Sequence, residues 1–258
     1  MSAGIPSPRE GLPRQSRLPV AVPVALGLAL LAPGVASAER AAARAGVTPD
    51  AKRRTPPART TLRPKKVLNM PAGWTWPPSP EMREAGERCL ERLKGAGVEF
   101  QPGPERPRIT TPVVVPSWTF GGVKLVPLTR RRPLVVDCHL AEALAVAGGP
   151  DLKALGVTEI RFTSLYEYRN VKRRRILSRH AVGLAIDIYE VVTKDGVVRR
   201  VPRHYRNADG FLKSVERALR KSPLFRSPLT PGNEPRGHWD HFHLEARTTA
   251  ERAEVPNT

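Results

Sequence analysis

Three of the chain's six histidines lie within one six-residue segment, His238-Trp239-Asp240-His241-Phe242-His243. Strand residues two positions apart share a face, so a strand here places His241 and His243 on the same side. Two imidazoles on one face, joined by a third imidazole and a carboxylate from elsewhere, are enough to surround a zinc ion. A catalytic zinc needs three protein ligands and one open position for water. The segment therefore predicts part of a metal site.

A second segment, SRHAVGLAID from Ser178 to Asp187, offers an imidazole and a carboxylate. Small and apolar residues separate His180 from Asp187, so we expect a loop to present His180 and a strand to present Asp187. Gly183 permits the bend between them. Each segment alone has a simpler interpretation, since a His-x-His strand is more often a polar sheet face and a spaced His/Asp pair is usually a surface pair. Their occurrence together favours the metal site.

The order S-x-H-x-x-G-x-A-x-D followed by H-x-H resembles the zinc-peptidase superfamily of D-alanyl-D-alanine carboxypeptidases, murein endopeptidases, lysostaphin-type enzymes and Hedgehog signalling domains. More closely, residues 89–245 resemble the bacterial extensin-like C-terminal domain family within that group. The matching stretches are CLERLKGAGVEF, DCHLA, YEYRN, SRHAVGLAIDI, the turn at Gly196, and DHFHLE. The resemblance implies one zinc ion per chain, held by His180, Asp187 and His243.

The same resemblance suggests two general bases. Asp240 stands three positions before the last ligand, where the carboxypeptidases carry a glutamate, and its side chain is one methylene shorter. His241 and His238 match histidines that line the site of the murein endopeptidases. Both bases stay open, and we favour His241 as the transition-state partner with Asp240 as base or orienter.

Arg169, in the segment YEYRN, matches an upstream arginine of these families. Its implied role is to stabilise the tetrahedral oxyanion or to bind a substrate carboxylate. The alternative is a surface ion pair with a nearby carboxylate. We expect Ser178 to cap the loop that holds His180, because no G-x-S-x-G turn surrounds it as a nucleophile.

The resemblance implies an exported zinc-dependent peptidase that acts on peptidoglycan peptides, of the D,D-carboxypeptidase or endopeptidase type. The alternative is a catalytically inactive, zinc-containing module that binds the cell wall. Retention of Asp240 and His241 favours the enzyme, because a pure binder needs no base beside the metal. The sequence gives no oligomeric state.

The first 72 residues read as two segments outside the fold. Residues 1–38 combine a basic start, an apolar middle and an Ala-Ser-Ala exit, which predicts a secretory signal peptide and a periplasmic or secreted protein. Residues 39–72 are rich in Pro and Arg without apolar periodicity, which predicts a disordered basic linker. Such a linker acts as a tether, with loose adhesion to an anionic envelope surface as the further interpretation.

The formal net charge of +19 invites a nucleic-acid interpretation. Its distribution argues against that partner, because +2 lies in residues 1–38 and +7 in residues 39–72, outside the expected domain. Much of the rest precedes His180, and a basic approach to the site suits a carboxylate-rich wall peptide. We therefore expect no nucleic-acid partner.

The remaining chain predicts an α+β domain over residues 73–247, followed by a disordered tail, 248–258. We expect a small, largely antiparallel sheet flanked by helices, and the resemblance implies a Hedgehog/D-Ala-D-Ala-peptidase-like zinc core. Expected helices begin after Ser79, after Asp137 and near Ala208; expected strands lie at 110–115, 123–126, 157–162, 185–192, 197–201 and 241–245. Cys89 and Cys138 are expected to form a disulfide after export, with two buried thiols as the alternative.

Overall fold

The computed structural model describes residues 69–129, 134–207 and 210–254. Every described residue belongs to one compact unit, which falls within residues 60–258. The predicted signal peptide and residues 39–68 of the predicted linker lie outside the described residues. Met70 is buried in the core, so ordered chain begins before the expected start at residue 73. Among the described residues, no helix has the length and apolar character to cross a membrane.

Two sheets form the β part of the fold. The larger has the order β3-β4-β6-β7-β8, with β9 paired to β7 as well. Its strands are β3 (Thr119–Phe120), β4 (Val123–Pro127), β6 (Val157–Ser164), β7 (Ala185–Thr193), β8 (Val198–Arg200) and β9 (Phe242–Glu245). Only the β4/β6 pair is parallel among the pairings of this sheet in the described residues. The smaller sheet joins β1 (Gln101–Pro102), β2 (Pro112–Val114) and β5 (Val136–Asp137). The expected mixed α+β architecture is confirmed.

Two helices begin at the caps that the sequence predicts. Ser79 caps α1 (Pro80–Gly95) by accepting from the Met82 amide at 3.3 Å. Asp137 caps α2 by accepting from the His139 amide at 3.0 Å. The other helical segments are α2 (Cys138–Ala143), the π-helical turn η1 (Leu144–Gly148), α3 (Gly149–Ala154), the 3-10 turn η2 (Arg179–Val182), α4 (Val201–His204), α5 (Gly210–Lys221) and α6 (Thr249–Ala253).

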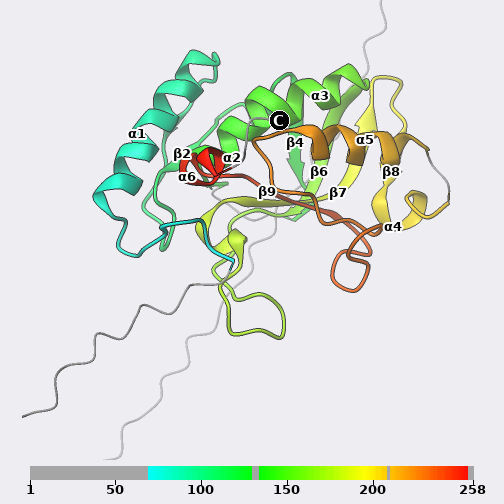
Figure 1. The fold of residues 1–258 in the computed structure, drawn as a ribbon. Coiled ribbons are helices and arrows are strands. Elements are labelled where there is room, and N and C mark those ends of the chain that lie inside the picture. Colours follow the sequence, from blue (N-terminus) through cyan, green and yellow to red (C-terminus); the bar gives the residue numbers. More distant parts are fainter. Residues whose placement is uncertain (1–68, 130–133, 208–209, 255–258) are drawn as a thin grey trace, which may run out of the picture. The chain divides into compact units, whose positions relative to one another are not determined.

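The hydrophobic core packs against one face of the larger sheet. In Figure 1, α2, α3 and α5 lie on the same side of this sheet. Ile186 and Ile188 of β7 and Leu244 of β9 belong to the hydrophobic core. Because strand residues alternate between faces, Asp187 and His243 project from the opposite face. The β7/β9 pairing therefore places polar side chains together on the face of the sheet opposite the hydrophobic core.

A disulfide and an ion pair join α1 to α2. Cys89 and Cys138 form the expected disulfide, with Cα atoms 6.1 Å apart. Arg92 donates through Nε to Glu142 Oε1 at 2.7 Å. Glu142 also pairs with Arg252 at 2.9 Å, so the C-terminal segment joins the same contact.

The predicted disordered tail is wrong for its first part. Thr248 and Glu251 form a capping box that starts α6. Glu251 is buried and accepts a hydrogen bond from Arg179 Nη1 at 3.0 Å. The segment is ordered because its carboxylate neutralises a buried arginine far away in the sequence, a partner that local composition does not reveal.

Candidate metal centre

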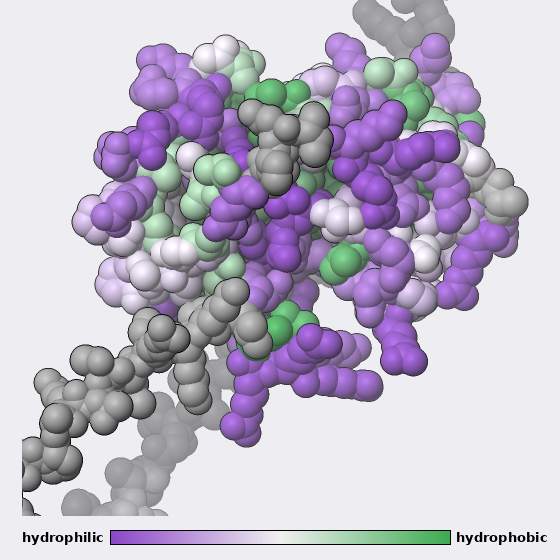
Figure 2. Space-filling view, viewed as in Figure 1, coloured by the Kyte–Doolittle hydropathy of each residue, from purple (hydrophilic) through white to green (hydrophobic). Residues whose placement is uncertain are grey.

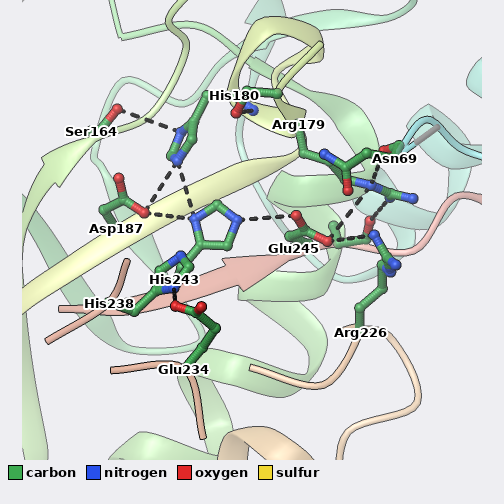
Figure 3. A network of polar contacts seen from close by, with 12 residues as sticks. Asn69, Ser164, Arg179, His180, Asp187, Arg226, Glu234, His238, His243 and Glu245 are labelled. Atoms are coloured by element: carbon green, nitrogen blue, oxygen red, sulfur yellow. Dashed lines mark hydrogen bonds and ion pairs between the residues drawn. The ribbon is translucent and has the colours of Figure 1, made fainter. Parts of the chain in front are cut away.

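Three side chains from three segments meet on the free face of the larger sheet (Figure 3). Asp187 and His243 are directly opposite each other in the antiparallel β7/β9 pair, and His243 Nδ1 lies 2.7 Å from Asp187 Oδ1. His180 Nε2 reaches the same point, 3.1 Å from Asp187 Oδ1 and 3.2 Å from His243 Nδ1. All three residues are buried. We call His180, Asp187 and His243 the His/Asp cluster.

A short turn presents His180. Ser178 accepts a hydrogen bond from the His180 amide at 3.3 Å, as the sequence predicts for a cap. Gly183 ends the turn with φ of 70°, a left-handed conformation that favours glycine. A Cβ atom on Gly183 would lie 2.8 Å from the Asp137 nitrogen, so a larger residue would also collide with backbone. The chain can then enter β7 and bring Asp187 back beside His180.

Each cluster histidine has an acceptor behind it. His180 Nδ1 lies 2.5 Å from the Leu165 carbonyl oxygen, which only accepts, so Nδ1 carries a proton and Nε2 faces the cluster. His243 Nε2 lies 3.1 Å from Glu245 Oε1, so Nε2 donates and Nδ1 faces the cluster. Metal-binding histidines characteristically donate their other ring N–H to a carbonyl or carboxylate in this way.

The cluster favours positive charge. Burial raises the pKa of Asp187, but the imidazoles of His180 and His243 outweigh burial and hold the pKa well below its usual value. Burial lowers the pKa of His243, but its hydrogen bonds to Asp187 and Glu245 outweigh burial and raise the pKa to about 9. A buried carboxylate and inward-facing ring nitrogens therefore form an environment that stabilises a cation.

The spacing of the donor atoms fits a tetrahedral ion. Atoms bound to zinc at about 2.0–2.1 Å with tetrahedral angles lie about 3.3 Å apart. The two distances from His180 Nε2, 3.1 and 3.2 Å, are close to this spacing, and the His243–Asp187 distance of 2.7 Å is shorter. Two imidazoles and one carboxylate are also a donor set that zinc prefers, with His243 giving up its Nδ1 proton on binding. The residues present therefore fit the ion that the resemblance implies.

Two further imidazoles border the cluster, each with its own carboxylate. His241 Nδ1 lies 2.7 Å from Asp240 Oδ1, while its Nε2 is 3.5 Å from Asp187 Oδ1. His238 Nδ1 lies 3.2 Å from Glu234 Oε2. Ligand atoms of His238, His241 and His243 also come within 4.8 Å of one another, so this trio forms a second group able to hold an ion. Burial, followed by the positive charge of His243, lowers the pKa of His238 and favours its neutral form.

Arg169 has a different partner. Its Nε donates to Glu167 Oε2 at 2.9 Å, and the side chain is 41% exposed. Within the described residues, the ion pairs of Arg169 do not include the His/Asp cluster. The geometry agrees with the ion-pair alternative, and the oxyanion role stays a prediction.

The structure adds residues that sequence reasoning did not assign. Glu245 accepts from His243 on one side and from Arg226 Nη1 at 2.6 Å on the other. Buried Arg179 lies 3.7 Å from Glu245 and also binds the Asn69 carbonyl and Glu251 (Figure 3). Glu245 could have been found from its position two residues after His243 on one strand. No sequence pattern identified Arg179 as a neighbour of the cluster, since only its charge distinguishes it.

Another histidine lies apart from the cluster and lines a separate cavity. His139 Nδ1 lies 2.8 Å from Asp137 Oδ1, and both side chains are buried. They border a cavity of about 250 Å³ whose lining also includes Trp74, Met82 and Leu184 and none of the cluster residues.

Comparison with known proteins identifies one relationship. Residues 87–255 match the family model described as the extensin-like protein C-terminus. No curated protein and no solved structure matches the chain. The match contains all seven residues that the sequence singled out for the site, namely Arg169, His180, Asp187, His238, Asp240, His241 and His243.

Proposed function

The chain belongs to the extensin-like C-terminal family, and from this premise we propose that it is a zinc-dependent peptidase of peptidoglycan peptides. The observation that carries the proposal is the convergence of His180, Asp187 and His243 beside the His241–Asp240 pair. Ligands alone would suit a binding module. An imidazole that faces the ligands and is held by a carboxylate is what a hydrolase needs in addition.

His180, Asp187 and His243 would hold one zinc ion in this proposal. Bound there, zinc would polarise a peptide carbonyl and would lower the pKa of a water molecule bound to it to about 7. Leu165 and Glu245 fix the orientation of the two imidazoles, and zinc would displace the proton that His243 Nδ1 shares with Asp187.

His241 is the proposed proton carrier. Its Nδ1–H donates to Asp240, so its Nε2, on the side of Asp187, is free to take a proton from water and return it to the leaving nitrogen. Asp240 then acts as the orienter, because its carboxylate holds the tautomer that a base requires. Within this proposal, therefore, the imidazole of His241 and not the carboxylate of Asp240 is the base.

The substrate class comes from the family resemblance and from the predicted export signal. A D,D-carboxypeptidase or endopeptidase would meet peptide stems or crossbridges of the wall outside the inner membrane. The exposed side chain of Trp239 lies between His238 and Asp240 in sequence and is 53% exposed, so it is free to contact such a polymer beside the bases.

Digestion of purified peptidoglycan, followed by mass spectrometry of the released fragments, tests the proposal. We expect fragments with zinc, none with a chelator, and recovery when zinc is restored. His241→Ala should bind zinc yet release little, whereas His204→Ala is the matched control because His204 bonds only to backbone atoms of Arg200 among the described residues. A zinc-loaded protein that binds the wall and cleaves nothing would contradict the enzyme and indicate the binding module.

A further inference from the structure

A two-stranded hairpin leads into the segment that carries His180. Asn170 and Leu177 form an antiparallel bridge, and the Val171 amide donates to the Ile176 carbonyl at 2.8 Å. The tip is residues 172–175, where Arg173 takes a left-handed φ of 61°. We call residues 170–177 the basic hairpin. In Figure 1 it forms the yellow-green loop that extends from the body of the domain.

The tip of the basic hairpin carries four consecutive cations, Lys172, Arg173, Arg174 and Arg175, all of them exposed. None of the four makes an ion pair or a side-chain hydrogen bond with any residue in the ranges 69–129, 134–207 and 210–254. Their basic neighbours differ, because Arg161, Arg169 and Arg179 each pair with a glutamate. Figure 2 shows long, strongly hydrophilic side chains at the position of the hairpin. The tip therefore concentrates positive charge that these acidic groups leave unneutralised.

The hairpin is tied to the His/Asp cluster through its backbone. The Ser178 amide donates to the Arg169 carbonyl at 3.1 Å, and the Glu167 amide donates to the His180 carbonyl at 3.2 Å. These bonds continue the two-stranded ribbon down to the turn that presents His180. Arg174 and His180 are six positions apart in the sequence, so their Cα atoms lie at most about 22 Å from each other. A partner held at the tip is thus held close to the cluster.

We propose that the basic hairpin binds an anionic polymer whose own peptide bond is presented to the His/Asp cluster. This inference rests on the proposed function and deepens it, because it makes the substrate a carboxylate-bearing polymer rather than a short free peptide. Guanidinium groups bind carboxylates in bidentate geometry, and a local excess of one charge raises the concentration of its counter-ion. The tip has no apolar residue to enter a bilayer, which favours a polymer strand over a membrane.

Sedimentation of the full chain with purified peptidoglycan sacculi, in the presence of a chelator, measures this binding without catalysis. The variant K172Q/R173Q/R174Q/R175Q should bind about tenfold more weakly or worse, and added salt should reduce the difference. The matched control, R203Q/R206Q/R217Q/K221Q, removes the same charge from other exposed positions and should bind like the wild type. Thermal melting checks that both variants fold.

Activity gives the second readout. We expect kcat/KM on sacculi to fall with the hairpin variant by about the same factor, and kcat/KM on a short wall peptide to stay unchanged. If the hairpin variant binds sacculi more weakly and neither it nor the wild type cleaves them, the hairpin inference is supported and the proposed peptidase activity is contradicted. Equal binding of the hairpin variant and the wild type to sacculi would overturn it. The same binding measurement with phosphatidylglycerol vesicles tests the membrane alternative. If the hairpin variant loses binding to these vesicles only, the partner is a membrane and the inference is overturned.

Discussion

At the scale of single residues, the tautomers of two histidines decide what the cluster can do. Leu165 and Glu245 accept the outer N–H groups of His180 and His243, and thereby direct both inner nitrogens at Asp187. Burial raises the pKa of Glu245, but the hydrogen bond from His243 and nearby arginines outweigh burial and lower the pKa to about 2. Glu245 therefore remains a carboxylate throughout the range in which the protein is expected to act.

Glu245→Gln should weaken zinc binding about 10- to 100-fold, because the amide orients His243 less firmly and lowers its basicity. Competition with a chromophoric chelator measures the affinity. Arg226→Gln is the matched control, since it removes a different hydrogen-bond partner of Glu245 and leaves the His243 contact intact. Equal affinities in wild type and Glu245→Gln would show that Glu245 has no part in a metal site.

The roles of Asp240 and His241 can be separated by their kinetic costs. If His241 carries the proton, His241→Ala should lower kcat about 10²- to 10⁴-fold. Asp240→Asn should lower kcat only about tenfold, because the imidazole remains and loses its orienting charge. Zinc content should stay unchanged in both variants. The reverse order of the two losses would make Asp240 the base.

The sequence could predict the cluster but only some of its neighbours. His180, Asp187 and His243 stand out because histidine is rare in this chain and the two motifs occur in order. The carbonyl of Leu165 could not be predicted, because every residue has one. Glu234 is one of 24 acidic residues, and its distance from His238 follows from a loop without periodicity.

At the scale of elements, the sequence predicted those helices and strands whose positions depend on neighbouring residues. Apolar spacing and the Ser79 cap locate α1, and alternation locates β7 and β9. The order of α6 depends instead on Arg179, which is 72 positions from Glu251. Burial of Met70 likewise depends on distant core residues. Composition therefore predicted disorder at segments whose partners lie elsewhere in the chain.

Glu251→Gln should lower the free energy of unfolding by about 3 kcal/mol, because it leaves buried Arg179 with only the longer ion pair to Glu245. Glutamine still suits the capping box, so the change isolates the charge from the cap. Chemical denaturation measures the loss. Glu254→Gln, at an exposed position after α6, is the control and should cost little. Similar stabilities of the two variants would mean that the Arg179–Glu251 pair does not hold the segment.

At the scale of the whole described unit, α1, α2 and α6 are joined at one place. The Cys89–Cys138 disulfide closes a loop with a sequence separation of 49. A loop of this length contributes about 4 kcal/mol in the chain-entropy model. Glu142 pairs with Arg92 of α1 and Arg252 of α6 beside it. The disulfide and the ion pairs therefore stabilise the same junction.

The Glu142 contact predicts a pH-dependent stability. Burial raises the pKa of Glu142, but hydrogen bonds from Arg92 and Arg252 outweigh burial and lower the pKa below its usual value. A lowered pKa stabilises the fold above the unfolded value, about 4.3, and the contribution disappears as pH falls through the folded value. Glu142→Gln should therefore cost about 1–3 kcal/mol at pH 7 and progressively less below about pH 4.5.

Urea denaturation across pH measures this difference, with Glu87→Gln on the exposed side of α1 as the control. The control should show no pH-dependent difference from the wild type. A constant difference between Glu142→Gln and the wild type from pH 7 to pH 3 would rule out the ionised pair as its cause.

Zinc content of the purified protein tests the central claim most directly. Metal analysis after equilibration with zinc and removal of free ion should give about one zinc per chain. The His180→Ala variant should lose it, and His204→Ala should retain it. A folded wild-type protein that takes up no zinc, or a His180→Ala variant that binds zinc like the wild type, would contradict the metal centre and the function proposed from it.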